Sequence, residues 1–386
     1  MTKKAIAVLA SLLIIIGLLG GYCFILDRQI TALTELQVEA ERQVSDMQGD
    51  IDILKTKMGV LKTDVEGKIG ALSTKIEDIP ILDAERLYQE VKPAVVEVIT
   101  KTALAEGRKG SGFVFDSQGY IVTAYHVVEN ATEVEVILDD GTISSASVTG
   151  YCPYSDIAVL KSEQSLTMDE LVLGDSNAMA VGEPVIVMGS PFDLSGTVTS
   201  GIVSQKGRFI EIEYDRGKRR WVANLIQCDA PVNFGNSGGP LVNSKGEVVG
   251  LTVARINPEQ GDGIYYAVSS NKLKRVALAI IDHGSFDYPW IGIKIADLTP
   301  EKARARNLDT INGALVTEAI AGSVAATAGI RADDIILVID GFPIGKTADL
   351  VSYLGENKSP HESTVLTIIR DGEELELTLE LGKRES

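Results

Sequence analysis

An uncharged stretch of 22 residues near the start of the chain, from Ala5 to Leu26, limits how the first part of the protein can fold. At the helical rise of about 1.5 Å per residue, the stretch is about 33 Å long and spans one bilayer core. A cleaved signal peptide is the alternative, but its apolar region is typically about 7 to 15 residues long and ends at a small-residue cleavage site, which is not found here. We therefore predict a transmembrane anchor over residues 1–26.

The charges that flank the anchor predict its orientation. Lys3 and Lys4 favour a cytoplasmic N-terminus, although Arg28 on the other side weakens the bias. We expect a single-pass chain in the cell membrane whose residues after Asp27 lie outside the cytoplasm, in the periplasm or the extracellular space.

Residues 27–80 carry apolar side chains in the 3-4 spacing that is typical of a coiled-coil seam. The seam consists of Ile30, Leu33, Ala40, Val44, Met47, Ile51, Leu54, Met58, Leu61 and Val65, with the polar Gln37 between Leu33 and Ala40. An insertion of four residues then restores the pattern at Ile69, Leu72, Ile76 and Ile79. A solvated amphipathic helix is the alternative, because each glycine in the segment costs about 1 kcal/mol relative to alanine. We predict an oligomeric coiled-coil stalk, about 75 Å long at the helical rise.

Composition excludes several classes of partner. The 386 residues are 45% apolar and carry a formal net charge of -18, so two or three folded units are expected and nucleic acid is a poor partner. The three cysteines are too few for a disulfide-dense scaffold and lack a Cys-x-x-Cys metal spacing, so we predict no metal site. A disulfide bond between Cys152 and Cys228 is compatible with the sequence, which does not decide whether it forms.

Past Pro80 the chain changes to short β-branched runs, such as AVVEVIT, TEVEVILDDGT, EPVIVMGSP and EVVGLTVARI. Turn signals such as Asp139-Asp140-Gly141 separate these runs, which is typical of an antiparallel barrel or sandwich. We predict a mostly β domain of about 200 residues.

The string VNFGNSGGPL raises the question of whether Ser237 is a nucleophile, and the chain offers three histidines as its base. His283 and His361 lie beside turn residues and are most simply surface residues, whereas His126 ends a strand pattern. Asp156 heads the apolar run SDIAVLK, where a buried carboxylate needs a hydrogen-bonded or charged partner such as histidine.

The chemistry requires each of these residue types. A serine hydroxyl needs a base to take its proton, and a carboxylate fixes the tautomer of that base, so we assign His126, Asp156 and Ser237 to a catalytic triad. Charge developing on the scissile carbonyl oxygen needs two main-chain N–H donors aimed at one point, which we assign to Gly235 and Ser237. This chemistry needs no cofactor.

The segments GSGFVFDSQGYIVTAYHVV, SDIAVLK and QCDAPVNFGNSGGPL, in this order, resemble the trypsin-like serine proteases of the HtrA (Deg) family. The resemblance implies a chymotrypsin-like domain over residues 81–285, with two perpendicular β-barrels and the active site between them. It implies His126 as general base, Asp156 as its orienting acid and Ser237 as nucleophile.

Departures from the family pattern fall on the substrate cleft. The segment that reads Gly-Phe-Ala-Ile in most members of the family is Tyr265-Tyr266-Ala267-Val268 here. Phe234 directly precedes Gly235, one of the two assigned oxyanion donors. By position in the family, Val232, Ile256 and Ile264 would line a small apolar pocket for the residue before the cut, and Tyr265 would narrow or reshape it.

Residues 286–386 alternate strand patterns with two helical stretches and resemble a single PDZ domain, an α+β fold that binds a C-terminal peptide as an added strand. Trp290, Ile291, Gly292 and Ile293 match the loop that would hold the peptide carboxylate. The alternative is that Trp290 and Ile293 are ordinary core residues.

Together these features predict a membrane-tethered, ATP-independent serine endopeptidase that cuts unfolded or damaged proteins outside the cytoplasm. The resemblance implies a homotrimer and recognition of C-terminal peptides by the PDZ domain. A signalling protease with one membrane-protein substrate and a non-catalytic chaperone or binding scaffold are the alternatives.

Overall fold

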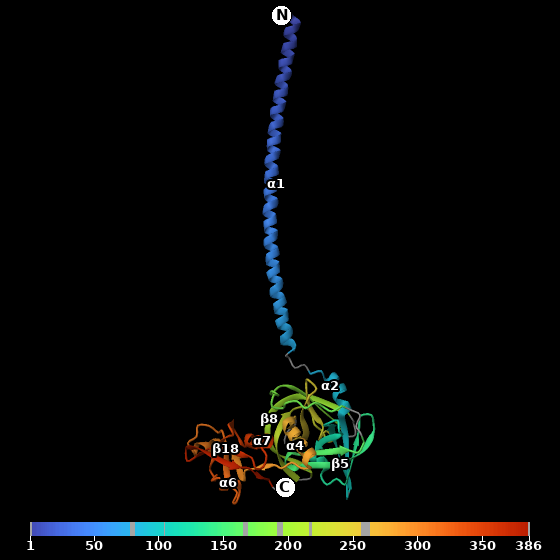
Figure 1. Cartoon of the computed structure of the whole chain (residues 1–386), viewed down its shortest axis with the longest axis vertical. Coiled ribbons are helices and arrows are strands. Elements are labelled where there is room, and N and C mark those ends of the chain that lie inside the picture. Colours follow the sequence, from blue (N-terminus) through green and yellow to red (C-terminus); the bar gives the residue numbers. More distant parts are fainter. Residues whose placement is uncertain are drawn as a thin grey trace. The chain divides into compact units, whose positions relative to one another are not determined.

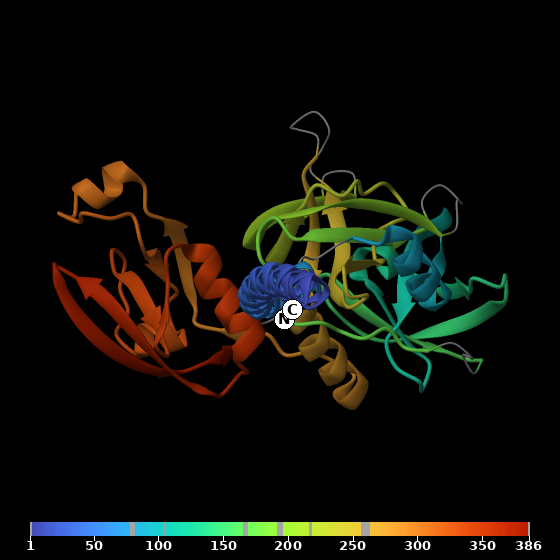
Figure 2. The ribbon, with the colours of Figure 1, turned by 90° about the horizontal axis from the view of Figure 1, so that it is seen from above.

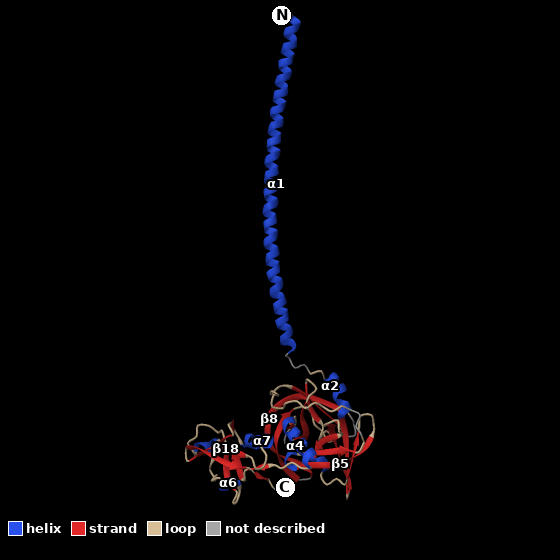
Figure 3. Ribbon diagram, viewed as in Figure 1, coloured by secondary structure: helices blue, strands red, loops and turns tan. Residues whose placement is uncertain are grey.

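The computed structural model describes every residue except 1, 78–81, 104, 165–168, 191–195, 216–217, 256–262 and 385–386. The chain divides into two compact units, Met1–Ile79 and Pro80–Ser386. The first unit is helical, whereas strands dominate the second (Figure 3).

The first unit is one continuous helix, α1, over Lys3–Glu77 (Figure 1). The predicted anchor and stalk therefore share one helix, and the four glycines of the stalk do not interrupt it. Among the described residues, α1 is the one helix long and apolar enough to cross a membrane, with a window of mean hydropathy 2.5. The large apolar side chains of the predicted seam from Ile30 to Leu72 are 44–70% exposed in the single chain. The side chains of the final two seam residues, Ile76 and Ile79, lie outside the part of the chain that the structure describes.

The second unit begins with a short amphipathic helix, α2, over Ala84–Val91. Asp83 caps this helix by accepting the N–H of Arg86 at 3.0 Å, which satisfies one of the N–H groups that the first turn leaves unpaired. The helix buries Leu87 and Val91, and the 3-10 turn η1, Lys92–Ala94, leads from it into the first barrel.

Twelve strands form two closed barrels, as the family resemblance implied; the strand patterns alone left a barrel or a sandwich open (Figure 2). The first barrel has the order β1-β2-β3-β6-β5-β4, with β1 Val95–Thr102, β2 Ala105–Val114, β3 Tyr120–Ala124, β4 Glu133–Ile137, β5 Ile143–Cys152 and β6 Ile157–Ser162. The second has the order β10-β11-β12-β9-β8-β7, with β7 Pro184–Gly189, β8 Thr197–Asp215, β9 Lys218–Cys228, β10 Pro240–Asn243, β11 Val248–Arg255 and β12 Tyr265–Ser269. All their pairings are antiparallel. Several strands are buried over consecutive residues, such as β6 and β7, because both of their faces are covered.

Helix α4, Ser270–His283, packs on the barrels through a stripe of apolar residues. Leu273, Val276, Ala277 and Ile280 follow the spacing of one helix face and are fully buried in the largest core cluster. Gly284 ends the helix with φ of 77°, and its N–H donates to the carbonyl of Ile280 at 2.8 Å.

The C-terminal part has its own core and a separate sheet, in agreement with the predicted PDZ fold. The sheet runs β14-β15-β16-β18-β19, with β14 Ile293–Asp297, β15 Ala314–Ala319, β16 Ile335–Ile339, β18 Ser363–Arg370 and β19 Glu373–Glu380, and with β17 Phe342–Pro343 paired to β16. Strands β13 Pro289–Trp290 and β20 Gly382–Lys383 form a small second sheet. The helices are α5 Pro300–Arg304, α6 Val324–Thr327 and α7 Thr347–Asn357. Strand β14 is at one edge of the main sheet.

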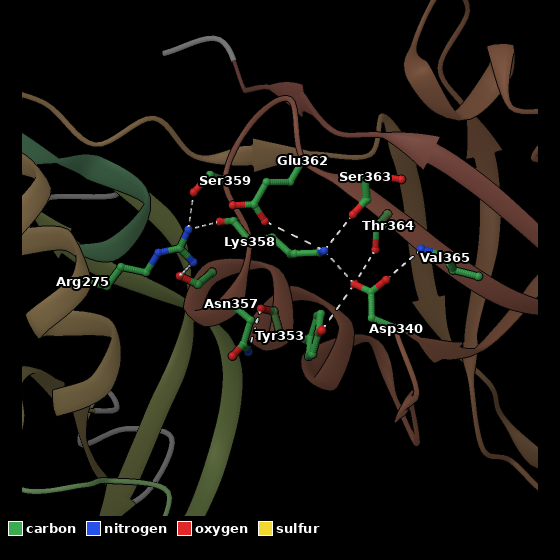
Figure 4. A network of polar contacts seen from close by, with 11 residues as sticks. Arg275, Asp340, Tyr353, Asn357, Lys358, Ser359, Glu362, Ser363, Thr364 and Val365 are labelled. Atoms are coloured by element: carbon green, nitrogen blue, oxygen red, sulfur yellow. Dashed lines mark hydrogen bonds and ion pairs between the residues drawn. The ribbon is translucent and has the colours of Figure 1, made fainter.

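Helix α7 joins this part to the barrels. The amide of Asn224 on β9 donates to the carbonyl of Ser352 at 3.0 Å, and the hydroxyl of Ser269 donates to Glu356 at 2.6 Å. At the end of α7, the guanidinium of Arg275 on α4 reaches the carbonyls of Gly355 and Lys358 and, at 2.8 Å, the hydroxyl of Ser359 (Figure 4).

Candidate active site

His126 and Asp156 lie next to each other because of the pairing between two strands of the first barrel. In the antiparallel pair β3 and β6, Ala124 is opposite Ile157. Residues that follow β3 and residues that precede β6 therefore meet at the same end of the barrel. His126 lies in the short helix α3, Tyr125–Val128, directly after β3, and Asp156 directly precedes β6.

Two contacts join these residues. The main-chain N–H of His126 donates to Oδ1 of Asp156 at 2.9 Å, and ring Nδ1 of His126 lies 2.7 Å from Oδ2. The side chains are 12% and 5% exposed, respectively, so water screens the pair weakly. This geometry fixes the proton of a neutral imidazole on Nδ1 and leaves Nε2 as the acceptor.

The main chain of Asp156 adopts a rarely populated conformation to make these contacts. Its φ of 53° lies in the left-handed region, after the 3-10 turn η2 over Pro153–Ser155. The N–H of Asp156 donates to the carbonyl of Pro153 at 3.3 Å, and its own carbonyl accepts from Tyr125 at 3.0 Å. The surrounding hydrogen bonds hold the strained residue in place, as is common at functional sites.

Ser237 lies in the loop between β9 and β10 of the second barrel. The N–H of Asn236 donates to the carbonyl of Asn233 at 3.0 Å, which closes a four-residue turn. Gly235, in the third position of this turn, has φ of 102°, which is the signature of a type II turn and favours glycine. Phe234, in the second position, is 72% exposed.

The turn lies against the part of the first barrel that carries His126. Gly110 on β2 is so enclosed that an added Cβ would meet the side chain of Val127 at 2.6 Å and the carbonyl oxygen of Ser237 at 3.1 Å. A Cβ on Gly238 would meet the main-chain oxygen of Ser111 and, at 2.9 Å, the main-chain nitrogen of Ala124. The segments of His126, Asp156 and Ser237 thus meet between the two barrels, although they are far apart in sequence.

The residues predicted for the substrate pocket divide into two groups. Val232 is buried in a core cluster of the second barrel, and the half-buried Tyr265 packs against the same cluster. Ile264 packs against the larger cluster, which includes residues of both barrels. Ile256 lies outside the described residues.

The predicted carboxylate loop connects β13 and β14 of the C-terminal part. Gly292 has φ of 86°, and an added Cβ would collide with Ser323, whose hydroxyl donates to the carbonyl of Gly292 at 3.0 Å. Ile291 is 3% exposed and belongs to the core, whereas Trp290 and Ile293 are half-buried.

No metal-binding group of three or more His, Cys, Asp or Glu occurs within the part of the chain that the structure describes. Cys152 and Cys228 are buried free thiols. Burial raises the pKa of both, to about 12 for Cys228, so neither is an activated thiolate at neutral pH.

Sequence reasoning missed Ser111, a fully buried residue of β2 whose N–H donates to the carbonyl of Ser237 at 2.8 Å. A serine between two glycines at the start of a strand pattern gives no sign of a distant partner. Its presence in the first motif of the family resemblance was the one available signal.

Two closed six-stranded barrels that present a paired His and Asp beside a glycine-rich serine turn define a trypsin-like peptidase domain, here followed by a PDZ domain. The family model of the trypsin-like peptidase domain matches residues 110–251 of this chain, and the family model of the PDZ domain matches residues 289–381. The chain belongs to the HtrA family of serine proteases.

Similar proteins support this assignment. A probable periplasmic serine endoprotease DegP-like of Bartonella henselae is 39% identical over 296 residues, which cover 76% of this chain and 57% of the relative. The periplasmic serine endoprotease DegP of Escherichia coli K12 is 38% identical over 276 residues, covering 70% of this chain and 56% of the relative. This chain thus matches little more than half the length of these relatives.

The fold is also found among solved structures. The HtrA-type protease AlgW with tripeptide is 30% identical, with a TM-score of 0.66, and the match covers 78% of this chain and 97% of that chain. The same protease with decapeptide is 27% identical, with a TM-score of 0.63, and the match covers 78% and 99%.

Proposed function

We propose that the chain is a serine endopeptidase in which Ser237 attacks the scissile carbonyl, His126 takes its proton and Asp156 orients the imidazole. The observation that carries this proposal is the double contact of Asp156 with His126, since it leaves Nε2 of the ring as the acceptor. The N–H groups of Gly235 and Ser237 then stabilise the oxyanion of the tetrahedral intermediate, in the role that the type II turn suits.

The test uses the full chain in detergent with a fluorophosphonate probe, which labels an activated serine. We expect labelling of the wild-type protein and of Ser244→Ala, a variant of a serine in the β10–β11 turn. Ser237→Ala should not be labelled. Equal labelling of the Ser237→Ala and wild-type proteins would remove the proposed nucleophile.

We also propose that α1 anchors the enzyme in the membrane, with a cytoplasmic N-terminus and the barrels outside the cytoplasm. The 18-residue window of mean hydropathy 2.5, the flanking Lys3 and Lys4 and the periplasmic relatives support this proposal. A protease-protection experiment on sealed membrane vesicles tests it. The barrels should be digested only in vesicles whose outer surface is the extracytoplasmic face of the membrane.

For the PDZ domain, we propose that a C-terminal peptide adds to the edge strand β14, with its carboxylate at residues 290–293. An edge strand offers unpaired main-chain groups, and the solved structures of the HtrA-type protease AlgW are of that protease with a tripeptide and with a decapeptide. Gly292→Ala should abolish the binding of a fluorescent peptide with an apolar C-terminus, because an added Cβ meets Ser323. Labelling of Ser237 in this variant should persist.

The proposed substrates are unfolded or damaged proteins outside the cytoplasm. Digestion of a reduced, unfolded model protein by the full chain, with and without a C-terminal peptide, tests this substrate class. Broad cutting without ATP supports the proposal. Cutting that is confined to one membrane-protein target and requires the peptide would instead assign a signalling role.

We further propose that the chain works as a homotrimer, held together in part by a coiled coil in α1. The exposure of the seam from Ile30 to Leu72 supports this, because apolar side chains at heptad spacing are stabilised by helices from other copies. Cross-linking of the full chain should yield a trimer, and a monomer would contradict the proposal.

A further inference from the structure

Ser111 uses its hydroxyl and both of its main-chain polar groups to connect three segments. Its main-chain N–H donates to the carbonyl of Ser237 at 2.8 Å, and its own carbonyl accepts the hydroxyl of Thr123 at 2.7 Å. Its hydroxyl donates to the carbonyl of Gly235 at 2.6 Å and accepts the N–H of Ser190 at 2.9 Å. Ser111 lies in the first barrel, whereas Ser190, Gly235 and Ser237 belong to the second.

The direction of the hydroxyl hydrogen bond is fixed by its partners. The N–H of Ser190 can only donate, so it occupies a lone pair of the hydroxyl oxygen. The carbonyl of Gly235 can only accept, so the hydroxyl proton points toward it. Ser111 is 0% exposed, so water cannot replace either partner at this position without a rearrangement.

These contacts hold one peptide group of the Asn233–Asn236 turn, here called the oxyanion turn, at both ends. The carbonyl of Gly235 and the N–H of Asn236 belong to the same peptide group. Ser111 binds the carbonyl at 2.6 Å, and the carbonyl of Asn233 binds the N–H at 3.0 Å. With that peptide group held, the main-chain torsions of Gly235, including its φ of 102°, determine where the N–H of Gly235 itself points.

The preceding peptide group, between Phe234 and Gly235, has two alternative orientations. A type I turn has φ near about -90° at its third residue, whereas a type II turn has φ near about +80°. Exchange between these turns flips the peptide group and exchanges the direction of its N–H with that of its carbonyl oxygen. An N–H that stabilises an oxyanion in one turn would be replaced by a repelling carbonyl oxygen in the other.

We propose that Ser111 is a positioning residue that keeps the oxyanion turn in its type II form, so that the N–H of Gly235 stays aimed at the reacting carbonyl. This inference rests on the proposed function and adds a residue from the opposite barrel to its machinery. Ser111 is 0% exposed and therefore out of reach of a substrate, and it acts through the carbonyl of Gly235.

The test compares Ser111→Ala with wild type in the full chain, using a chromogenic peptide substrate and a peptidyl boronate that forms a tetrahedral adduct. One oxyanion donor is worth about 10²- to 10³-fold, so partial loss of its orientation should lower kcat by about 10- to 100-fold. KM should change by less than about 3-fold, because the ground state gains little from the donor. The Ki of the boronate should rise by the same factor as kcat falls.

Ser144→Ala is the matched control. Ser144 is also in the first barrel, is 1% exposed and hydrogen-bonds through its hydroxyl to Ser162 at 2.9 Å. We expect both alanine variants to lose similar thermal stability, while Ser144→Ala keeps wild-type kcat and boronate affinity. Ser111→Cys retains a weaker donor of similar size and should give an intermediate kcat. It also serves as the test if Ser111→Ala does not fold.

Equal kcat values for Ser111→Ala and Ser144→Ala, or a change in KM alone, would overturn the inference. Failure of the proposed function has a different signature, since the wild-type chain would then neither hydrolyse the substrate nor react with the fluorophosphonate.

Discussion

Asp156 binds His126 through both of its carboxylate oxygens, one at the main-chain N–H and the other at ring Nδ1, at 2.9 and 2.7 Å. One residue thereby sets both the position of α3 and the tautomer of the imidazole. The two roles can be separated experimentally, because an amide side chain preserves the first and reverses the second.

Asp156→Asn should therefore lower kcat strongly without unfolding the domain. The amide oxygen can still accept the main-chain N–H, but the amide NH₂ facing Nδ1 favours the tautomer that carries its proton on Nε2. Such a ring cannot accept the proton of Ser237, and the expected loss in kcat is about 10⁴-fold. Steady-state hydrolysis of a peptide substrate measures it. Asp140→Asn, in an exposed turn, should retain wild-type kcat.

Gly238→Ala should destabilise the protein more than Gly141→Ala. Both residues have positive φ, 89° and 84°, so both variants strain the main chain by about 1 kcal/mol. An added Cβ meets nothing within 4 Å at Gly141, whereas at Gly238 it meets Ser111 and Thr123. Thermal unfolding should show the larger loss for Gly238→Ala, together with lost fluorophosphonate labelling. Equal melting temperatures would contradict this packing.

Lys272 should make stability depend on pH in the alkaline range. It is fully buried, donates to the carbonyl of Ala223 at 3.1 Å and lies near Cys152, Tyr288 and Glu356. Burial lowers its pKa from 10.5 to about 8, so between these values the unfolded chain binds the proton and the folded chain does not. The penalty for burying the charge is fully present below about pH 8 and is relieved as the pH rises toward 10.5.

The measurement is urea unfolding of wild type and Lys272→Met between pH 7 and pH 10.5. The free energy of unfolding of wild type, relative to the variant, should rise by about 3 kcal/mol across the upper part of this range. Groups common to both proteins cancel in the difference. A difference that stays constant with pH would show that Lys272 titrates normally.

Arg275→Ala should loosen the end of α7 from the barrels. The guanidinium is half-buried and reaches Gly355, Lys358 and Ser359, so its removal leaves several acceptors without a donor (Figure 4). The expected loss of local stability is about 1–3 kcal/mol, which faster hydrogen exchange in α7 would report. Arg304→Ala, a change of an exposed side chain at the end of α5, should leave the exchange of α7 unchanged.

Leu54→Asp should dissociate the assembly if α1 forms the proposed coiled coil. A charge at a seam position is buried without a partner, whereas the neighbouring Ile53 lies off the seam. Both side chains are exposed in the single chain, at 62% and 54%. Light scattering of the full chain in detergent should show a smaller particle for Leu54→Asp than for Ile53→Asp. Equal particle sizes would indicate that this stretch does not form the seam.

The sequence allowed the fold class to be predicted because strand runs, turn signals and the heptad spacing are local patterns. The pairing of His126 with Asp156 was also within reach, since a carboxylate at the head of an apolar run needs a partner. Other features depend on contacts that leave no local trace. Lys272 lies in an ordinary amphipathic helix, and its acceptor is a main-chain carbonyl 49 positions away. Ser111 also gives no local signal in the sequence, because the acceptor of its hydroxyl hydrogen bond is a main-chain carbonyl, which every residue carries.

Helix α7 packs beside the edge strand β14 and is also bonded to the barrels through Ser352 and Glu356. A ligand whose affinity depends on the position of α7 must therefore also change the free energy of those two hydrogen bonds. Linkage makes the effect mutual: a change in the barrels that favours one placement of α7 alters the ligand's affinity by the same factor by which the ligand alters that equilibrium.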